Sequence, residues 1–323
     1  MLVTGGRGFI GTHLVEQLAS AGCEVVSLDT AAHATGESAG VTEIVGDVRD
    51  TGVMETLVRR HGIDMIFDLA SYTEVGLPRA AYERNVAATR SMVEVVRATG
   101  VRKYVFFSTQ FVFRRPDRMP VDDDEYWPVD NYGASKVLSE EAIRASLPPE
   151  QYLIVRPAYV WGPGLSRFRD GLLYRLARGQ LLISSDPTRV RYYGYVRTVA
   201  DQARALSELS FEDLPHHVFY LSDPAISLRD FCKALTAALG RGHAIPVPST
   251  VIRLLGAIGD GLSRVGLPAP INSMQAREMT VNFPIPIDRT LQMTGCMTNL
   301  TSAAEETVAW ARQDPDWLSR TRI

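Results

Sequence analysis

The stretch that decides the fold is Leu2-Val3-Thr4-Gly5-Gly6-Arg7-Gly8-Phe9-Ile10-Gly11, an apolar run followed by closely spaced glycines. Glycines at Gly5, Gly8 and Gly11 allow a tight turn, a close approach of the backbone to a pyrophosphate, and close packing of a helix on a strand. The free amides and the positive dipole end of such a helix attract phosphate. The stretch therefore predicts a strand, a dinucleotide-binding loop that includes Phe9 and Ile10, and a helix.

The first half of the chain alternates short apolar runs with amphipathic helical patterns. The predicted strands are residues 2–4, 24–28, 43–45, 65–69, 103–107 and 152–155. The predicted helices between them are residues 10–20, 53–60, 80–99 and 132–146. Apolar strands separated by helices are typical of a parallel sheet covered on both faces. We therefore expect an α/β fold with a doubly wound parallel sheet.

The pattern changes near Pro157, where proline and glycine become frequent and helices predominate. The predicted helices are residues 168–178, 199–209, 228–239, 249–265 and 301–312, with a strand-like stretch at 181–191. We expect a dinucleotide-binding domain at residues 1–157. Residues 158–323 would form a smaller substrate lobe, from which some segments return to the sheet. Such a lobe would lie over the carboxyl edge of the strands, where open α/β sheets bind ligands.

Composition narrows the class of protein. The chain has 323 residues, of which 46% are hydrophobic, and a formal net charge of −3. That charge provides no basic field for nucleic acid or an anionic membrane, and no apolar run is long enough to span a bilayer. The three cysteines are scattered, and the acidic run at residues 122–125 has the pattern of a solvated loop, so no metal site is predicted. We expect a cytoplasmic protein without nucleic-acid or membrane partners.

Asp29 is the predicted selector of the cofactor. It ends the second strand 18 positions after Gly11, near the spacing of about 20 residues at which an acid binds the adenosine ribose. A carboxylate at this place accepts from ribose hydroxyls and repels a 2′-phosphate, which favours NAD. Arg7 is a cation in the same loop that a 2′-phosphate could reach, so NADP remains the alternative.

Two further stretches follow predicted strands. Asp47-Val48 comes after the third strand, where Asp47 would either accept from the adenine amino group or cap the next helix. Leu69-Ala70-Ser71 comes after the fourth strand, and its small residues would let a flat cofactor lie against the backbone. Tight internal packing is the alternative explanation for them.

The sequence predicts a catalytic acid/base group at Tyr132-Gly-Ala-Ser-Lys136. On a helix this spacing places both side chains on one face, one turn apart. A nearby ammonium favours the phenolate and lowers the tyrosine pKa toward a value useful in base catalysis. Ser108-Thr109 ends the fifth strand beside this helix, so a hydroxyl there would hold a substrate oxygen against Tyr132.

In combination these motifs give the chain a family resemblance. The shared features are, in order, Gly5/Gly8/Gly11, Asp29, Asp47-Val48, Leu69-Ala70, Asn85, Ser108-Thr109, Tyr132-x-x-x-Lys136 and Arg156-Pro157 with Gly162-Pro163. The chain resembles an extended short-chain dehydrogenase/reductase of the NAD-dependent epimerase/dehydratase family. The resemblance implies that Thr109, Tyr132 and Lys136 are catalytic, that Lys136 also binds the nicotinamide ribose, and that Pro157 lines the cofactor site. It also implies a homodimer through the helices at residues 80–99 and 132–146.

The chain departs from the family pattern around the substrate. Gln110-Phe111 follows Thr109 where sugar-nucleotide 4,6-dehydratases have Asp-Glu, so dehydration is disfavoured. Residues 112–114 replace Val-Tyr-Gly, which we interpret as a loop difference of little chemical meaning. Thr73 replaces a long basic residue of some 4-epimerases.

The residues predicted to contact the substrate are Thr73, Gln110, Tyr159 and Arg191, of which the last two belong to the second lobe. Tyr159 stands where nucleotide-sugar enzymes often have asparagine. Arg191 matches the arginine that grips the substrate pyrophosphate in nucleotide-sugar members, or else is one surface arginine among several.

The sequence leads to a nucleotide-sugar epimerase that uses NAD, acting at C4 through a transient keto intermediate. The alternative is a dehydrogenase or ketoreductase that releases the ketone of a sugar or another secondary alcohol. A cofactor-sensing protein on the same fold is a third hypothesis, disfavoured because both Tyr132 and Lys136 are kept.

Overall fold

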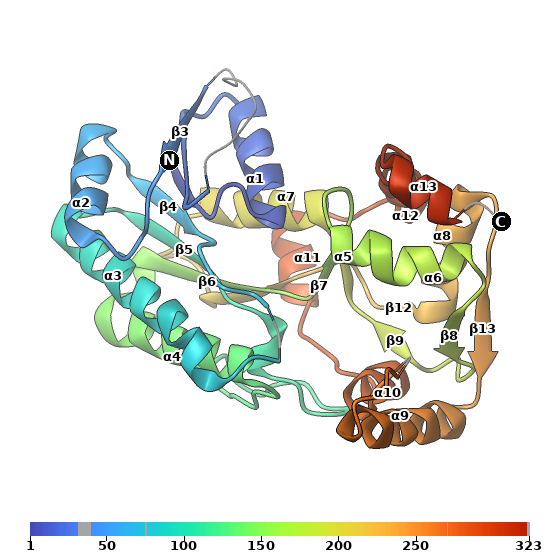
Figure 1. The fold of residues 1–323 in the computed structure, drawn as a ribbon. Helices are drawn as coiled ribbons and strands as arrows, with labels where there is room; N and C mark the ends of the chain where they lie inside the picture. Colours follow the sequence, from blue (N-terminus) through green and yellow to red (C-terminus); the bar gives the residue numbers. More distant parts are fainter. Residues whose placement is uncertain (32–39, 75, 270, 322–323) are drawn as a thin grey trace.

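A seven-stranded parallel sheet organises the first part of the molecule (Figure 1). The computed structural model describes residues 1–31, 40–74, 76–269 and 271–321. The strand order is β11-β6-β5-β4-β1-β2-β3. The strands are β1 (Leu2–Thr4), β2 (Val25–Asp29), β3 (Val41–Val45), β4 (Met65–Asp68), β5 (Lys103–Phe107), β6 (Tyr152–Pro157) and β11 (Val218–Leu221). The six predicted strands are all present, and the doubly wound sheet is confirmed.

Helices cover both faces of this sheet because successive residues of each strand point to opposite sides. The helices on one face are α1 (Phe9–Ser20) and α7 (Val196–Glu208), and those on the other are α2 (Thr51–Arg60), α3 (Glu83–Thr99) and α4 (Asn131–Ser146). In β1, Leu2 packs into the core under α2, α3 and α4, whereas Val3 packs into the core under α1 and α7. Both side chains are fully buried.

The second lobe is built from short strands and helices. Its elements are β7 (Tyr159–Trp161), α5 (Ser166–Phe168), a π-helix (Arg169–Leu173), α6 (Tyr174–Ala177), β8 (Leu181–Ser184), β9 (Val190–Arg191), β10 (Tyr193–Tyr195), β12 (Ile226–Ser227), α8 (Leu228–Leu239), β13 (Ala244–Val247), α9 (Ser249–Arg264), α10 (Ser273–Thr280), α12 (Leu300–Ala311) and α13 (Pro315–Thr321). Trp161, Phe231 and Trp317 anchor its own apolar core. The chain enters this lobe through β7, directly after β6, and the lobe lies to the right of the sheet in Figure 1.

Three elements that follow Pro157 belong to the sheet domain rather than to the lobe. β11 pairs with β6 as the edge strand, and α7 packs on the sheet beside α1. The third, α11 (Asp288–Thr294), packs against β11 and α7. The predicted strand-like stretch 181–191 is divided between β8, which pairs with β13, and β9, which pairs with β12. Among the described residues no helix combines the length and apolar character needed to cross a bilayer.

Candidate active site

The loop between β1 and α1 lies directly against the end of β4. Gly5 has φ +65°, and a Cβ on it would lie 2.9 Å from the carbonyl carbon of Leu69. The amide of Leu69 donates to the carbonyl of Thr4 (3.1 Å), and that of Ala70 donates to the Thr4 hydroxyl (3.2 Å). The predicted cofactor loop and the Leu69-Ala70 segment are therefore brought together, with the start of α1 at Phe9.

Asp29 lies at the end of β2, beside this loop. Its carboxylate accepts from the amides of Arg7 and Ala31, each at 3.2 Å. The Arg7 guanidinium is turned toward β3, where it forms an ion pair with Glu43 (2.7 Å). The cation that kept NADP as the alternative is thus compensated by a neighbouring carboxylate. Asp29 stays the predicted ribose-binding residue.

Asp47 is not a helix cap. The cap of α2 is Asp50, which accepts from the amide of Val53 (3.1 Å). Asp47 is instead bound by the backbone and guanidinium of Arg49, whose hydrogen bonds lower the pKa of this carboxyl. The next residue, Val48, packs into the core.

Tyr132 is fixed at the first turn of α4. The helix is capped by Asp130, which accepts from the amide of Gly133 (2.7 Å). The Tyr132 ring is 8% exposed and lies 6.0 Å from the ring of Tyr82 and 6.4 Å from that of Phe111. A Cβ on Gly133 would lie 2.4 Å from the carbonyl oxygen of Phe111. The absence of a side chain at this position lets α4 lie directly against the turn that follows Thr109.

The pKa of Tyr132 is raised above its ordinary value, mainly by burial and then by Asp130. The charge that opposes this rise is Arg167, on α5, with a smaller contribution from Ser71. The structure therefore differs from the lowered pKa that the Tyr-Lys spacing predicts. Arg167 is a residue that sequence reasoning missed, since no local motif marks it.

Lys136 is buried behind Tyr132 on the same helix. Its ammonium donates to the carbonyl of Phe107 at the end of β5 (2.8 Å). Burial lowers its pKa to about 8, and the nearby carboxylates of Asp68 and Glu140 oppose this. In this structure Lys136 therefore connects α4 to β5, and its electrostatic partners are Asp68 and Glu140.

Of the two hydroxyls that end β5, Thr109 is the one available to a substrate. Ser108 donates to Glu140, which is fully buried in a bidentate ion pair with Arg156 (2.6 and 3.0 Å). Within the described part of the chain, the Thr109 hydroxyl only accepts, from the amide of Phe111 (3.3 Å). No acceptor for its proton is found among those residues, so the structure separates a structural serine from a candidate catalytic threonine.

A charged cluster that sequence reasoning missed lies beyond Phe111. Arg114, treated above as part of a loop difference, is 1% exposed and donates to Gln110 (3.1 Å) and to the hydroxyl of Tyr159 (3.0 Å). It also forms an ion pair with Glu278 of α10, which accepts from the Tyr159 hydroxyl as well. Arginine in place of the family's usual glycine at position 114 was the sequence signal for it.

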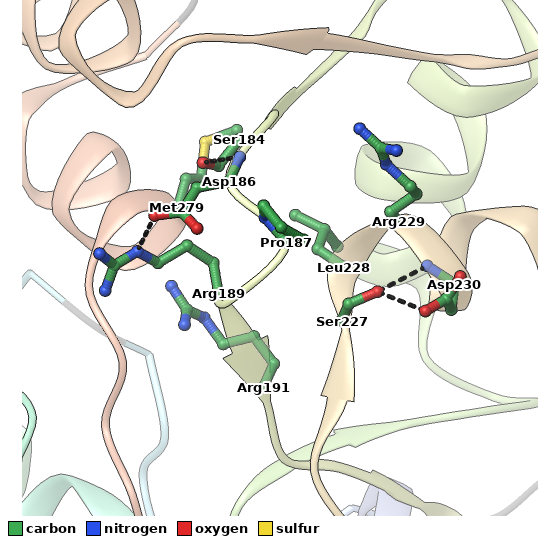
Figure 2. Close-up of a pocket in the computed structure, with 10 residues that line it drawn as sticks. All are labelled: Ser184, Asp186, Pro187, Arg189, Arg191, Ser227, Leu228, Arg229, Asp230 and Met279. Atoms are coloured by element: carbon green, nitrogen blue, oxygen red, sulfur yellow. Dashed lines mark hydrogen bonds and ion pairs between the residues drawn. The ribbon is translucent and has the colours of Figure 1, made fainter.

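Arg191 lines a cavity of about 110 Å³ in the second lobe (Figure 2). The other lining residues are Ser184, Asp186, Pro187, Arg189, Ser227, Leu228, Arg229, Asp230 and Met279. Arg191 is 7% exposed, and burial lowers its pKa. One of its terminal nitrogens donates to the Val190 carbonyl (2.7 Å), whereas the other is buried without a partner among the described residues.

Two predicted residues stand apart from this cluster. Thr73 lies in the exposed segment after β4, and its hydroxyl forms no hydrogen bond within the part of the chain that the structure describes. Pro157 ends β6 and is buried. Asn85 supports the same segment, since its side chain pairs with the amide and carbonyl of Tyr72.

Comparison with known proteins identifies the family of this chain. Residues 1–219 match the model of the NAD dependent epimerase/dehydratase family. The chain is 34% identical to a UDP-glucose 4-epimerase of Streptomyces lividans over 150 residues, which is 44% of this chain and 46% of that protein. It is 26% identical to a 2-alkyl-3-oxoalkanoate reductase of Stenotrophomonas maltophilia (strain K279a) over 270 residues, which is 80% of this chain and 76% of that protein. The match thus spans about half the length of the epimerase and most of the reductase.

Solved structures share the fold over almost the whole chain. TunA, described as an NAD dependent-NDP-hexosamine 5,6-dehydratase of tunicamycin biosynthesis, has 25% identity and a TM-score of 0.70, with 97% of both chains covered. WbmG of Bordetella bronchiseptica, in complex with NAD and UDP, has 22% identity and a TM-score of 0.72, with 97% of this chain and 93% of that chain covered. Because the family model matches about two thirds of the chain, the protein belongs to the NAD dependent epimerase/dehydratase family, which confirms the resemblance and the predicted cofactor, NAD.

Proposed function

We propose that the protein is a nucleotide-sugar epimerase that inverts C4 through a transient keto intermediate. The observation that carries this proposal is a continuous series of contacts from the candidate base to the cavity. The rings of Tyr132, Phe111 and Tyr159 follow one another at 6.4 and 6.3 Å. Burial raises the pKa of the Tyr159 phenol, and the nearby guanidinium groups of Arg114 and Arg191 oppose this rise, so Tyr159 lies close to Arg191. One ligand would thus contact both Tyr132 and Arg191.

The residues around the β1–α1 loop fit NAD. Backbone amides at the start of α1 would hold the pyrophosphate, and Asp29 would accept from the adenosine ribose. The Ser71 hydroxyl is buried near Tyr132, where it would face the nicotinamide. When bound, NAD supplies a reversible hydride acceptor and, in its oxidised form, a positive charge near the phenol.

Tyr132 and Thr109 would act on one substrate oxygen. The phenolate of Tyr132 would remove the hydroxyl proton while the hydrogen on the same carbon leaves as the hydride that NAD would accept, and the Thr109 hydroxyl would donate to the oxygen as it becomes a carbonyl. Lys136 holds the helix that carries Tyr132 against β5. After the ketone turns over in the site, Tyr132 returns the proton to the oxygen. Binding energy from the nucleotide at Arg191 would retain the ketone during this turn.

Elimination of water is disfavoured by the residue that follows Thr109. Gln110 is 1% exposed and its amide oxygen accepts from Arg114. An amide neither donates nor accepts a proton near neutral pH, so it cannot serve as the acid or base of dehydration. This supports epimerisation over dehydration.

The test is the Tyr132→Phe variant, assayed for epimer formation on a panel of nucleotide sugars and for NAD binding by calorimetry. We expect turnover to be nearly abolished with NAD binding retained, because the ring stays and only the hydroxyl is lost. Tyr152→Phe, another buried tyrosine, is the matched control and should keep its activity. Substantial turnover by Tyr132→Phe would rule out the assignment.

A second candidate is a dehydrogenase or ketoreductase, which releases its product instead of returning the hydride to the same molecule. The match over 80% of the chain to a 2-alkyl-3-oxoalkanoate reductase favours it. The two candidates differ in how they use the cofactor. An epimerase turns over with the NAD it retains after purification, whereas a reductase consumes added cofactor in proportion to product.

We also propose that the protein is a homodimer through α3 and α4. These helices pack on each other and form one outer surface of the sheet domain (Figure 1). Leu138 of α4 is 38% exposed there. Sedimentation analysis should give a dimer for the wild type and a monomer for Leu138→Glu, and a wild-type monomer would contradict the proposal.

A further inference from the structure

Arg114 has the surroundings of a ligand-binding group rather than of a surface arginine. Its guanidinium lies 3.8 Å from the centre of the Phe283 ring, which fixes its plane. The three acceptors around it are Gln110, Tyr159 and Glu278. A planar cation held in this way presents its donors in a fixed direction.

The cluster around Arg114 holds more donors than acceptors. Nε of Arg114 and Nε2 of Gln110 are each buried without a hydrogen-bond partner among the described residues. Both side chains are more than nine-tenths buried. Since buried donors are normally paired, two unpaired ones in one cluster indicate a ligand that brings acceptors.

The charge of the cluster leads to the same conclusion. Arg114 is a buried cation, and among the described residues Glu278 is the carboxylate paired with it. Burial of an uncompensated charge is unfavourable unless a counter-ion is supplied. If Glu278 turns away from Arg114, a ligand with a negative charge would have to take its place.

Glu278 shows where such a charge would sit. Its carboxylate binds both Arg114 and the Tyr159 hydroxyl, and its side chain is 27% exposed, against 1% for Arg114. Glu278 can therefore turn to solvent, whereas Arg114 cannot move out of the cluster. When Glu278 turns away, a substrate carboxylate can bind Arg114 at the position that the Glu278 carboxylate now occupies.

We propose that Arg114 is a specificity-determining residue that binds a carboxylate on the sugar ring, so that the substrates are nucleotide uronates, and that Glu278 occupies this position until the substrate displaces it. This proposal rests on the proposed function. Arg114 pairs with Gln110, the neighbour of Thr109, so its guanidinium serves the part of the substrate near the reacting carbon. Arg191 lines the separate cavity expected to receive the diphosphate. The planar fork of an arginine matches a carboxylate through two hydrogen bonds.

The test compares UDP-glucuronate with UDP-glucose, which share the nucleotide and the diphosphate and differ in the carboxylate. Turnover is measured on the NAD-loaded enzyme. Binding is measured by calorimetry on the NAD-loaded Tyr132→Phe variant, in which no ligand is consumed. We expect kcat/KM and affinity to favour UDP-glucuronate at least about tenfold, a typical effect of one charge-assisted pair.

Three variants separate this role from a structural one. Arg114→Gln should lower the glucuronate-to-glucose ratio about tenfold or more, mainly through KM and Kd. Glu278→Gln should raise the same ratio several-fold, because the competing negative charge is gone. Arg115→Gln removes the same charge from an exposed neighbour and should leave the ratio unchanged.

Each other outcome overturns the proposal. A wild-type enzyme that uses UDP-glucose without preferring UDP-glucuronate contradicts carboxylate binding at Arg114 and leaves the epimerase proposal intact. Equal losses on both substrates in Arg114→Gln, with no change of ratio in Glu278→Gln, would assign the cluster to the diphosphate or to folding. Binding of neither nucleotide by NAD-loaded protein would remove the proposed function as well.

Discussion

Replacement of Gly133 by alanine tests how closely the catalytic helix must approach the Thr109 turn. In an ordinary helix interior this change stabilises by about 1 kcal/mol. At Gly133 the new Cβ would lie 2.4 Å from the carbonyl oxygen of Phe111, so the two must separate by at least about 0.6 Å to reach an acceptable contact near 3.0 Å. Overpacking of this kind costs about 1–3 kcal/mol. The net loss in the free energy of unfolding should then be between about 0 and 2 kcal/mol.

The effect on catalysis should be much larger than the effect on stability. The segment that must move carries Thr109 and Gln110, and a misplacement near 1 Å costs about a hundredfold in rate. We expect kcat on the best nucleotide sugar to fall about ten- to a hundredfold, with NAD affinity unchanged. Turnover and urea unfolding are the two measurements.

A matched control exists in α9. Gly261 has no atom within 4 Å of the position that its Cβ would take. Gly261→Ala should therefore be stabilised by up to about 1 kcal/mol and keep full activity. If Gly133→Ala behaves like Gly261→Ala, gaining stability without losing kcat, the reasoning from the Phe111 contact is refuted.

Three other predictions concern buried charge and the cofactor. Glu140→Gln leaves the Arg156 guanidinium fully buried without its counter-charge and should lower the free energy of unfolding in urea by about 3–5 kcal/mol. The control Glu141→Gln, at an exposed neighbour, should lower it little, and equal effects of the two variants would contradict the importance of the Glu140–Arg156 pair. Burial lowers the folded-state pKa of Lys136 to about 8, below the unfolded value, so unfolding takes up a proton between about pH 8 and 10.4. The free energy of unfolding should therefore rise with pH in that window, by up to about 1.4 kcal/mol per pH unit. Lys136→Met should show a flatter pH dependence, and a slope identical to that of the wild type would argue against the lowered pKa. Asp29→Asn removes the negative charge that repels a 2′-phosphate and should improve NADP binding relative to NAD about tenfold by calorimetry; an unchanged ratio would show that Asp29 does not select the cofactor.

The fold, and the geometry of the loop that we propose binds NAD, were largely predictable because their signals are local. A strand, a tight glycine turn and a helix start are set by consecutive residues, so the stretch from Leu2 to Gly11 carries its own geometry. The alternation of apolar strands with helices is likewise visible in the sequence, and six strands of the sheet lie where they were expected. The position of Asp29 at the end of β2 follows from the same regularity.

Charge pairing was the part that local patterns could not supply. Arg7 forms an ion pair with Glu43 of β3, so its positive charge is compensated. Lys136 meets Asp68 and Glu140 in the core, so its electrostatic effect on Tyr132 differs from the one that helical spacing alone predicts. Each of these outcomes depends on which side chains the sheet brings face to face.

The sequence by itself determined a doubly wound sheet, an NAD loop and a Tyr132–Lys136 helix, because each is specified by residues close together in the chain. Only the tertiary structure decided what surrounds the substrate. Arg114 and Glu278 are 164 residues apart, and their ion pair exists because α10 of the second lobe packs over the turn that follows β5. Contacts of this range depend on the relative placement of the sheet and the lobe. No short sequence motif encodes that placement.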